Sequence, residues 1–391
     1  MLKIISLTLS LTAFIAVIWI IVPAPAYYIW IYSVAASEWS LWLGALALSA
    51  IIFSICTPIY GGGGKLWIAS LIISLTALVI SLYPFLSVLR LAREQNVPLS
   101  ISEYFSGLKG DNYSDNDFTT RTFANVNGKD LQFDVYAPQA QNENSGAAVI
   151  VIHGGSWNAG QRNDFPQWNR WLAAEGFTVF DIDYRLTPQP NYNTATGDVK
   201  CAVRYIKSHA AEFGIAPGRI ALFGRSAGAH LALLAAYSAG DARLPPSCSA
   251  NDENEQVRAI VSFYAPIDML WAYDHPANRF VINGPQTIAD FIGGNPHESA
   301  EILARFKLTS PLTHVSSTTP PTLLVHGGKD QLVREENMLF LDAKLNENNI
   351  VHKTIFIPYA QHGFDYNFNG WGAQITKPVM LDFLRENTKT K

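Results

Sequence analysis

The sequence predicts an α/β fold, with a mostly parallel sheet covered by helices on both faces, behind a strongly apolar N-terminal region. From about residue 118 onward, short and uniformly apolar runs alternate with helical stretches. Such runs are typical of parallel strands that are buried on both faces of a sheet. Before residue 90 the chain instead contains three long stretches without a charged side chain.

The apolar N-terminal region is predicted to cross a membrane. Residues 4–37, 39–64 and 66–89 carry no charge, and about 20 apolar residues suffice to span a bilayer. We expect three transmembrane helices near residues 4–22, 40–58 and 66–86, with PAPAYYIW (23–30) as an interfacial connector. Three buried helices of a soluble domain are the alternative, which is disfavoured because such helices keep a polar face.

The domain organisation follows from this break in composition. We expect a membrane region over residues 1–90, a polar linker over 91–117 that ends in KGDNYSDND, and the α/β domain over 118–391. Basic residues are balanced, with Lys3 and Lys65 on one side of the membrane and Arg90 and Arg93 on the other. The first helix often determines the orientation of a membrane protein. Lys3 therefore favours a cytoplasmic N-terminus and an extracytoplasmic α/β domain.

Charge and cysteine content exclude some classes of protein. The formal net charge of −4 gives no indication of a nucleic-acid partner. Three cysteines cannot form a disulfide framework, and Cys56 lies in an apolar run. Cys201 and Cys248 are therefore the only plausible pair, and whether they pair stays open because lone buried cysteines are common.

The strands and helices of the α/β domain are predicted in chain order. FTTRTFANV (118–126) and LQFDVYAP (131–138) alternate with period two around NGKD, which indicates a hairpin. Further strands are expected in AAVIVIHG (147–154), FTVFDIDY (177–184), RIALFG (219–224), VRAIVSFYAP (257–266), PTLLVHGG (321–328) and KTIFIPYA (353–360). Helices are expected in residues 195–213, 227–236 and 337–348.

One serine lies on a tight corner between a predicted strand and a predicted helix. GRSAG (224–228) has the G-x-S-x-G pattern, in which small neighbours let strand and helix approach closely. The hydroxyl of Ser226 would then be exposed at the carboxyl edge of the sheet, beside a helix N-terminus that favours developing negative charge. This context indicates a catalytic nucleophile, with a structural serine in a glycine turn as the alternative.

A serine nucleophile needs a base and an acid. His362 follows the last predicted strand and Asp330 follows the strand before it, so both belong to the same sheet edge as Ser226. We expect His362 to accept the serine proton and Asp330 to hold the imidazole in one tautomer. Asp268 also follows a strand and is the competing acid.

Donors for an oxyanion are expected from IVIHGGSWNAG (150–160). Its glycines have no β-carbon, so successive backbone N–H groups can face a ligand. We assign the N–H groups of Gly155, Ser156 and Ala227 to the oxyanion hole. His153 is expected to form structural hydrogen bonds in this loop. No residue spacing indicates a metal site, and no cofactor is expected.

Together these motifs resemble the α/β-hydrolase superfamily, and within it the carboxylesterases of the hormone-sensitive-lipase-like and BD-FAE-like group. HGGSW, DIDYRLTP, GRSAGAHLA, SPLTHV, PPTLLVHGGKDQLV and QHGF occur in the order found in that group. The resemblance implies an eight-stranded, mostly parallel sheet and ester hydrolysis through an acyl-serine. It also implies a triad of Ser226, Asp330 and His362, and oxyanion donors at Gly155, Ser156 and Ala227.

Two features depart from the family pattern or extend it. Arg225 stands where the family often has an acidic residue, and it would either form a structural ion pair or bind a substrate carboxylate. The segment at about 266–306 is long for a connection between strands and is expected to form a small cap. Its aromatic residues Trp271, Tyr273, Phe280 and Phe291 would line the acyl pocket or form the core of the cap.

The sequence therefore predicts a membrane-anchored serine carboxylesterase that acts on a small ester and binds the lipid bilayer through its N-terminal helices. Protein partners are not indicated. The alternatives are a catalytically inactive binding module, an amidase or formamidase, and an enzyme similar to isoprenylcysteine methylesterases, which GRSAGAH resembles. A transport role for the apolar helices is disfavoured because they carry no charged residue at mid-depth.

Overall fold

The computed structural model describes residues 2–60, 64–106, 117–139, 142, 144, 146–248 and 253–389. Most of the predicted KGDNYSDND loop lies outside these residues. Within them, an eight-stranded sheet has the order β1-β2-β4-β3-β5-β6-β7-β8. The strands are β1 (Thr119–Val126), β2 (Lys129–Tyr136), β3 (Ala148–Ile152), β4 (Thr178–Ile182), β5 (Ile220–Arg225), β6 (Ala259–Phe263), β7 (Thr322–Gly327) and β8 (His352–Ile357).

The strand pairing agrees with the prediction. The hairpin of β1 and β2 is antiparallel, β2 pairs antiparallel with β4, and all further pairs are parallel. Every residue of β3, β4, β5, β6 and β7 is buried. The uniformly apolar runs therefore reflect burial on both faces, as expected for parallel strands.

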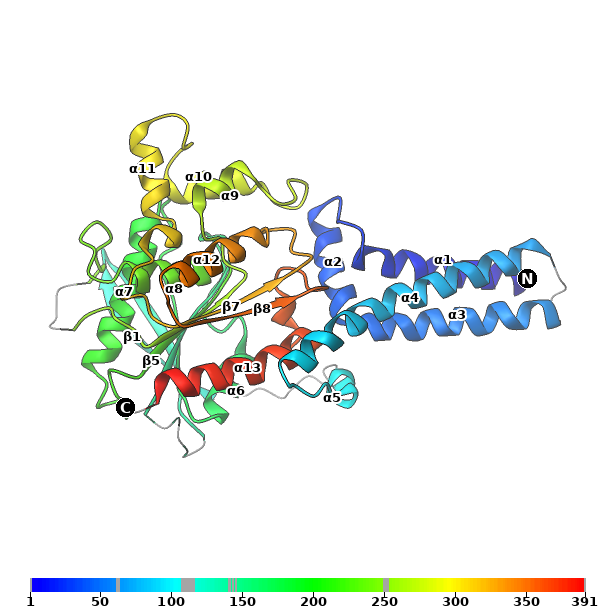
Figure 1. The fold of residues 1–391 in the computed structure, drawn as a ribbon, viewed down its shortest axis with the longest axis horizontal. Helices are drawn as coiled ribbons and strands as arrows, with labels where there is room; N and C mark the ends of the chain where they lie inside the picture. The colour runs from blue at the N-terminus through cyan, green and yellow to red at the C-terminus, as the bar shows by residue number, and fades with distance from the viewer. Residues whose placement is uncertain are drawn as a thin grey trace.

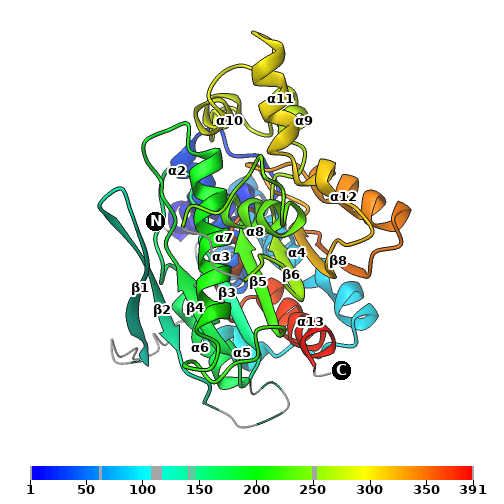
Figure 2. The same cartoon turned by 90° about the vertical axis from the view of Figure 1, so that its left-hand side faces the viewer.

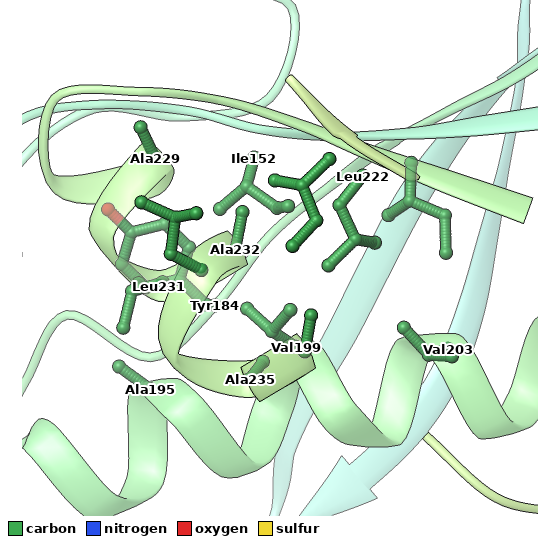
Figure 3. Close-up of a cluster of buried hydrophobic side chains, with 14 of the residues drawn as sticks. Ile152, Tyr184, Ala195, Val199, Val203, Leu222, Ala229, Leu231, Ala232 and Ala235 are labelled. Carbon is green, nitrogen blue, oxygen red and sulfur yellow. The ribbon is translucent and has the colours of Figure 1, made fainter. Parts of the chain in front are cut away.

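Helices cover both faces of the sheet (Figures 1 and 2). One face packs against α7 (Tyr192–Ser208), α8 (Ala227–Tyr237) and α12 (Glu336–Glu347), and Figure 3 shows Ile152 and Leu222 against side chains of α7 and α8. The other face packs against α6 (Pro166–Ala174) and α13 (Trp371–Thr388). Between β6 and β7, the predicted cap is present as α9 (Met269–Asp274), α10 (Gly284–Ile292) and α11 (Ala300–Leu308).

Three apolar helices form a rod that projects from the α/β domain (Figure 1). They are α1 (Leu2–Val17), which continues as a short 3-10 helix to Ile20, α3 (Ser40–Tyr60) and α4 (Lys65–Glu94). By length and composition, Leu2–Ile20, Ser40–Tyr60 and Lys65–Glu94 are sufficient to cross a membrane. This agrees with the three predicted spans, although α4 continues well past residue 86.

The rod has small residues inside and large apolar residues outside. Ser6 and Ser54 share a hydrogen bond of 3.0 Å between α1 and α3. A β-carbon on Gly44 would lie only 2.8 Å from the Oγ of Ser81, so α3 and α4 approach closely. Ile4 and Ile59, in contrast, are each 68% exposed. This arrangement is typical of helices that associate in lipid, where small residues allow close contact.

The structure differs from the predicted connector and linker. Residues 23–26 have no regular structure, but α2 (Tyr27–Glu38) begins inside the expected connector and lies across the end of the rod (Figure 1). The expected linker begins inside α4, and it contains a further helix, α5 (Ile101–Ser106). Val88 and Ala92 are buried in the core of the α/β domain, so the last turns of α4 belong to its packing.

The helices α2 and α5 also contact the α/β domain, through both aromatic and polar groups. Tyr104 stacks on Trp371 with ring centroids 4.3 Å apart. The side chain of Asn367 donates a 3.2 Å hydrogen bond to the carbonyl of Glu38, whose residue is 1% exposed. Burial raises the pKa of Glu38 well above its usual value, and the charge of Asp365 adds to this. The neutral carboxyl is therefore favoured at this interface.

Cys201 of α7 and Cys248 form a disulfide, with their Cα atoms 5.5 Å apart, and Cys56 is free. We predict one reactive thiol per chain when the full protein is unfolded in detergent without reductant, and three after reduction. Quantification with a maleimide reagent measures both numbers. Three reactive thiols before reduction would contradict the pairing.

Candidate active site

Ser226 lies on the turn between β5 and α8, with φ of 53° and ψ of −121°. This left-handed conformation is unfavourable for a residue with a side chain and persists because the surrounding packing imposes it. A β-carbon on Gly228 would lie 2.2 Å from the carbonyl oxygens of Ile152 and His153. One on Gly224 would lie 2.4 Å from the carbonyl oxygen of Gly228. Only glycine at both positions lets α8 pack this closely against the strands.

Ser226, His362 and Asp330 form one hydrogen-bonded chain. The Nε2 of His362 lies 2.8 Å from the Oγ of Ser226, and its Nδ1 lies 2.7 Å from an oxygen of Asp330. The three residues follow β5, β8 and β7, whose carboxyl ends meet at one edge of the sheet. The structure thus brings together the three residues that the sequence predicts as nucleophile, base and acid.

Asp330 is stabilised as a carboxylate although its side chain is buried. Burial by itself raises its pKa, but His362, His326 and the N–H of Val333 together outweigh this effect and hold the pKa of Asp330 below its usual value. The N–H groups of Leu332 and Val333 also donate to Asp330, at 2.8 and 2.9 Å. Burial lowers the pKa of nearby His326, whose Nε2–H donates to the carbonyl of Val333 at 2.9 Å. An ionised acid is therefore fixed against the imidazole of His362.

The loop after β3 reaches the same cavity as Ser226. Gly155, Ser156 and Trp157 all have positive φ, of 110°, 53° and 60°. A β-carbon on Gly155 would lie 2.2 Å from the carbonyl oxygen of Ala159, so only glycine fits there. Ser156 and Ala227 line the cavity beside Ser226, whereas Gly155 does not. Within the described residues, the N–H groups of Gly155, Ser156 and Ala227 have no protein acceptor.

A buried side-chain pair, which the sequence analysis missed, supports this loop. The indole Nε1 of Trp157 donates to the Nδ1 of His230 at 3.2 Å, and the Nε2–H of His230 donates to the carbonyl of Thr309 at 2.8 Å. Burial lowers the pKa of His230 to about 4, so the ring stays neutral and its Nδ1 can accept a hydrogen bond from the indole N–H. Trp157 also stacks on Phe291 of α10, with centroids 4.4 Å apart. The loop is thereby tied to α8 and to the cap.

His153 behaves as a structural residue, as expected from the sequence. Its ring stacks on Tyr184 at 4.3 Å, and its Nδ1 lies 2.7 Å from the carbonyl oxygen of Gly154. Burial lowers its pKa. Asp268, the competing acid, instead caps α9 by accepting the N–H of Trp271 at 3.0 Å.

Arg225 forms a buried ion pair next to the hydrogen-bonded chain of Ser226, His362 and Asp330. Its side chain is 2% exposed, and its Nε lies 2.5 Å from the carboxylate of Asp365. The other oxygen of Asp365 accepts the hydroxyl of Tyr264 at 2.5 Å, and the ring of Tyr264 lies 4.4 Å from that of His362. Arg225 does not line the cavity. Of the two roles considered for Arg225, the structure supports the ion pair.

The cavity above Ser226 has about 580 Å³ of empty space, part of it open to solvent. Its cap side is formed by Ala272, His275, Pro276, Ala277, Ile282, Gly284, Thr287 and Ile288. The four cap aromatics predicted as pocket or core residues do not line it. Phe291 is buried on Trp157, and Tyr273 packs on Phe306 with centroids 5.5 Å apart. Phe280 is 80% exposed and belongs to neither group.

The energetic coupling between Arg225 and Asp365 can be tested by substitution. We predict that Arg225→Met alone lowers the free energy of unfolding by about 3 to 5 kcal/mol, because it leaves Asp365 charged and buried. Adding Asp365→Leu to Arg225→Met should recover part of this loss. Denaturant unfolding of the full chain in detergent measures Arg225→Met, Asp365→Leu and the double variant. A double variant as unstable as the sum of the single losses would show that the pair is not coupled.

Comparison with known proteins agrees with this geometry. The chain is 31% identical over 234 residues to the probable carboxylic ester hydrolase LipM and 29% identical over 220 residues to the esterase LipQ, both of Mycobacterium tuberculosis (strain ATCC 25618 / H37Rv). Each match covers 56% of this chain and 50% of the relative, so the chain spans about half the length of these curated relatives.

Solved structures and a family model agree on the fold and the family. A truncated carbohydrate esterase from gut microbiota is 25% identical, with a TM-score of 0.56, over 70% of this chain and 98% of that one. This similarity confirms the α/β-hydrolase fold expected from the sequence. The BD-FAE family model matches residues 133–345, which is more than half of the chain. The chain belongs to the BD-FAE family of the α/β-hydrolase fold.

Proposed function

We propose that the chain is a membrane-anchored serine hydrolase that cleaves carboxylic esters through an acyl-serine intermediate. The hydrogen-bonded chain from Ser226 through His362 to Asp330 is the observation that carries this proposal. It supports proton transfer from the serine to the imidazole, because a buried and ionised acid stabilises the imidazolium that forms. The names of the relatives LipM and LipQ favour an ester as substrate.

Acylation begins when the Oγ of Ser226 attacks the ester carbonyl and its proton passes to the Nε2 of His362. The carbonyl oxygen becomes an oxyanion, which accepts hydrogen bonds from the N–H groups of Ser156 and Ala227 and from that of Gly155. Such preorganised donors are commonly a large part of the rate enhancement in acyl transfer. When the intermediate collapses, the bond to the alcohol oxygen breaks and the imidazolium of His362 protonates the departing alcohol.

Deacylation repeats the same steps with water. His362 takes a proton from the water as its oxygen attacks the acyl carbonyl, and the same N–H groups stabilise the second oxyanion. Collapse returns the proton to the Oγ of Ser226 and releases the carboxylic acid. Asp330 remains ionised throughout, which is consistent with its lowered pKa.

We further propose that residues 1–90 anchor the protein in a membrane, that 91–117 connect to a hydrolase domain over 118–391, and that about 266–306 form its cap. The three long apolar helices, with small residues inside and large ones outside, support the anchor. The disulfide between Cys201 and Cys248 supports an extracytoplasmic hydrolase domain, because disulfides persist in oxidising compartments.

The decisive experiment measures hydrolysis of p-nitrophenyl esters from acetate to laurate by the full chain in detergent. We predict that Ser226→Ala lowers the rate by about 10⁴-fold or more and that Asp330→Asn lowers it by about 10⁴-fold, because the imidazole then adopts the wrong tautomer. The dependence on acyl length measures the size of the acyl pocket.

Asp268→Asn is the matched control, since it changes the competing acid while keeping an acceptor for the cap of α9. Its rate should stay within about twofold of that of the unmodified protein. Equal inactivity of the unmodified chain and Ser226→Ala, with both folded, would contradict the proposal and favour a binding module. Activity restricted to p-nitroanilides would instead indicate an amidase.

A further inference from the structure

The segment that joins α1 to α2 is bound to the loops that carry the acid and base of the triad. The N–H of Ala24 donates to the side-chain oxygen of Gln331 at 2.8 Å, and the side chain of Asn278 in the cap donates to the carbonyl of Ala24 at 2.6 Å. The amide of Gln331 in turn donates to Gln361 at 3.2 Å. Gln331 directly follows the acid, and Gln361 directly precedes the base. The end of the first apolar helix is therefore held close to the triad.

A groove runs between this segment and the cap. Its walls are formed by residues 23–25, by residues 277–280 of the cap, and by Asp330, Gln331 and Arg334 from the loop after β7. Ala277 and Arg334 also line the cavity of Ser226. The groove and the cavity thus share two wall residues, and the groove lies on the side of the cavity that faces the apolar helices.

The rim of the groove has the composition of a membrane interface. Phe280 is 80% exposed at the tip of the loop between α9 and α10, and the exposed Arg279 precedes it. Two residues after the groove-lining Pro25, α2 begins with Tyr27 and Tyr28, which are 49% and 81% exposed. Figure 1 shows this cap loop beside α2, at the end of the helical rod. Aromatic rings with a neighbouring cation are favoured at the level of lipid headgroups, where both apolar and polar contacts are available.

We propose that the groove opens onto the bilayer surface and that the substrate is an amphipathic ester dissolved in the membrane. Its hydrocarbon part occupies the groove while its ester carbonyl reaches Ser226. The inference follows from the two wall residues that groove and cavity share, and from the hydrogen bonds that hold Ala24 against Gln331 and the cap residue Asn278. It rests on the proposed ester hydrolase function and assigns the class of substrate to it.

The test uses the full chain reconstituted into phosphatidylcholine vesicles and two esters with the same leaving group. p-Nitrophenyl butyrate is presented in water, and p-nitrophenyl palmitate is dissolved in the vesicle lipid. The rate with palmitate should follow its mole fraction in the bilayer at constant bulk concentration. Phe280→Asp should lower the ratio of palmitate to butyrate rates about tenfold, since one buried phenyl ring contributes about that factor to partitioning. Phe280→Leu should largely preserve the ratio.

Val351→Asp is the matched control, because Val351 is 63% exposed and precedes β8. It therefore lies at the amino end of this strand, whereas the groove and the candidate site lie at the carboxyl ends. It should leave both rates unchanged. A ratio that is unaffected by Phe280→Asp, or lowered equally by Val351→Asp, would overturn the inference. A palmitate rate that follows bulk concentration would also overturn it. Failure of the unmodified protein to hydrolyse either ester would instead count against the proposed hydrolase function, so the two failures are distinguishable.

Discussion

The close approach of α8 to the carboxyl ends of β3 and β5 is the constraint on which the site depends. It requires glycine at 224 and 228, because a β-carbon at either position would overlap backbone atoms. The same approach forces Ser226 into the left-handed region and directs its hydroxyl toward His362. It also leaves the first N–H of α8 beside the serine. The position of the proposed nucleophile and that of one proposed oxyanion donor therefore result from one packing contact, which the buried strands on either side make rigid.

The residues adjacent to the triad connect it to the rest of the molecule. Arg225, before the nucleophile, pairs with Asp365, three residues after His362. Gln331, after Asp330, binds the backbone of Ala24 in the segment between the first apolar helix and α2. Ser226, His362 and Asp330 thus hydrogen-bond to one another. The residues next to Ser226 and Asp330 in sequence contact residues that are distant in the chain. The segment after the first apolar helix therefore contacts the loop that carries Asp330, so the proposed membrane anchor and the candidate site are physically linked in this chain.

Much of the fold and of the candidate site could be predicted from the sequence, because short stretches of the chain carry the patterns that indicate them. Uniformly apolar runs identify strands buried on both faces, and the strand–GRSAG–helix pattern marks the position of Ser226. Partners distant in sequence could not be predicted. Trp157 and His230 are 73 residues apart, and Arg225 and Asp365 are 140 apart. The helix that begins at Tyr27 was missed because its flanking prolines and apolar composition equally suit an interfacial connector.

In the proposed mechanism, His362 activates Ser226 for acyl transfer. The most direct measurement treats the full chain in vesicles with a fluorophosphonate and maps the adduct by peptide mass spectrometry. We predict one adduct per chain, on Ser226, and a loss of labelling in His362→Gln because the hydroxyl then lacks its base. Labelling of another serine, or equal labelling of Ser226 in His362→Gln, would contradict it.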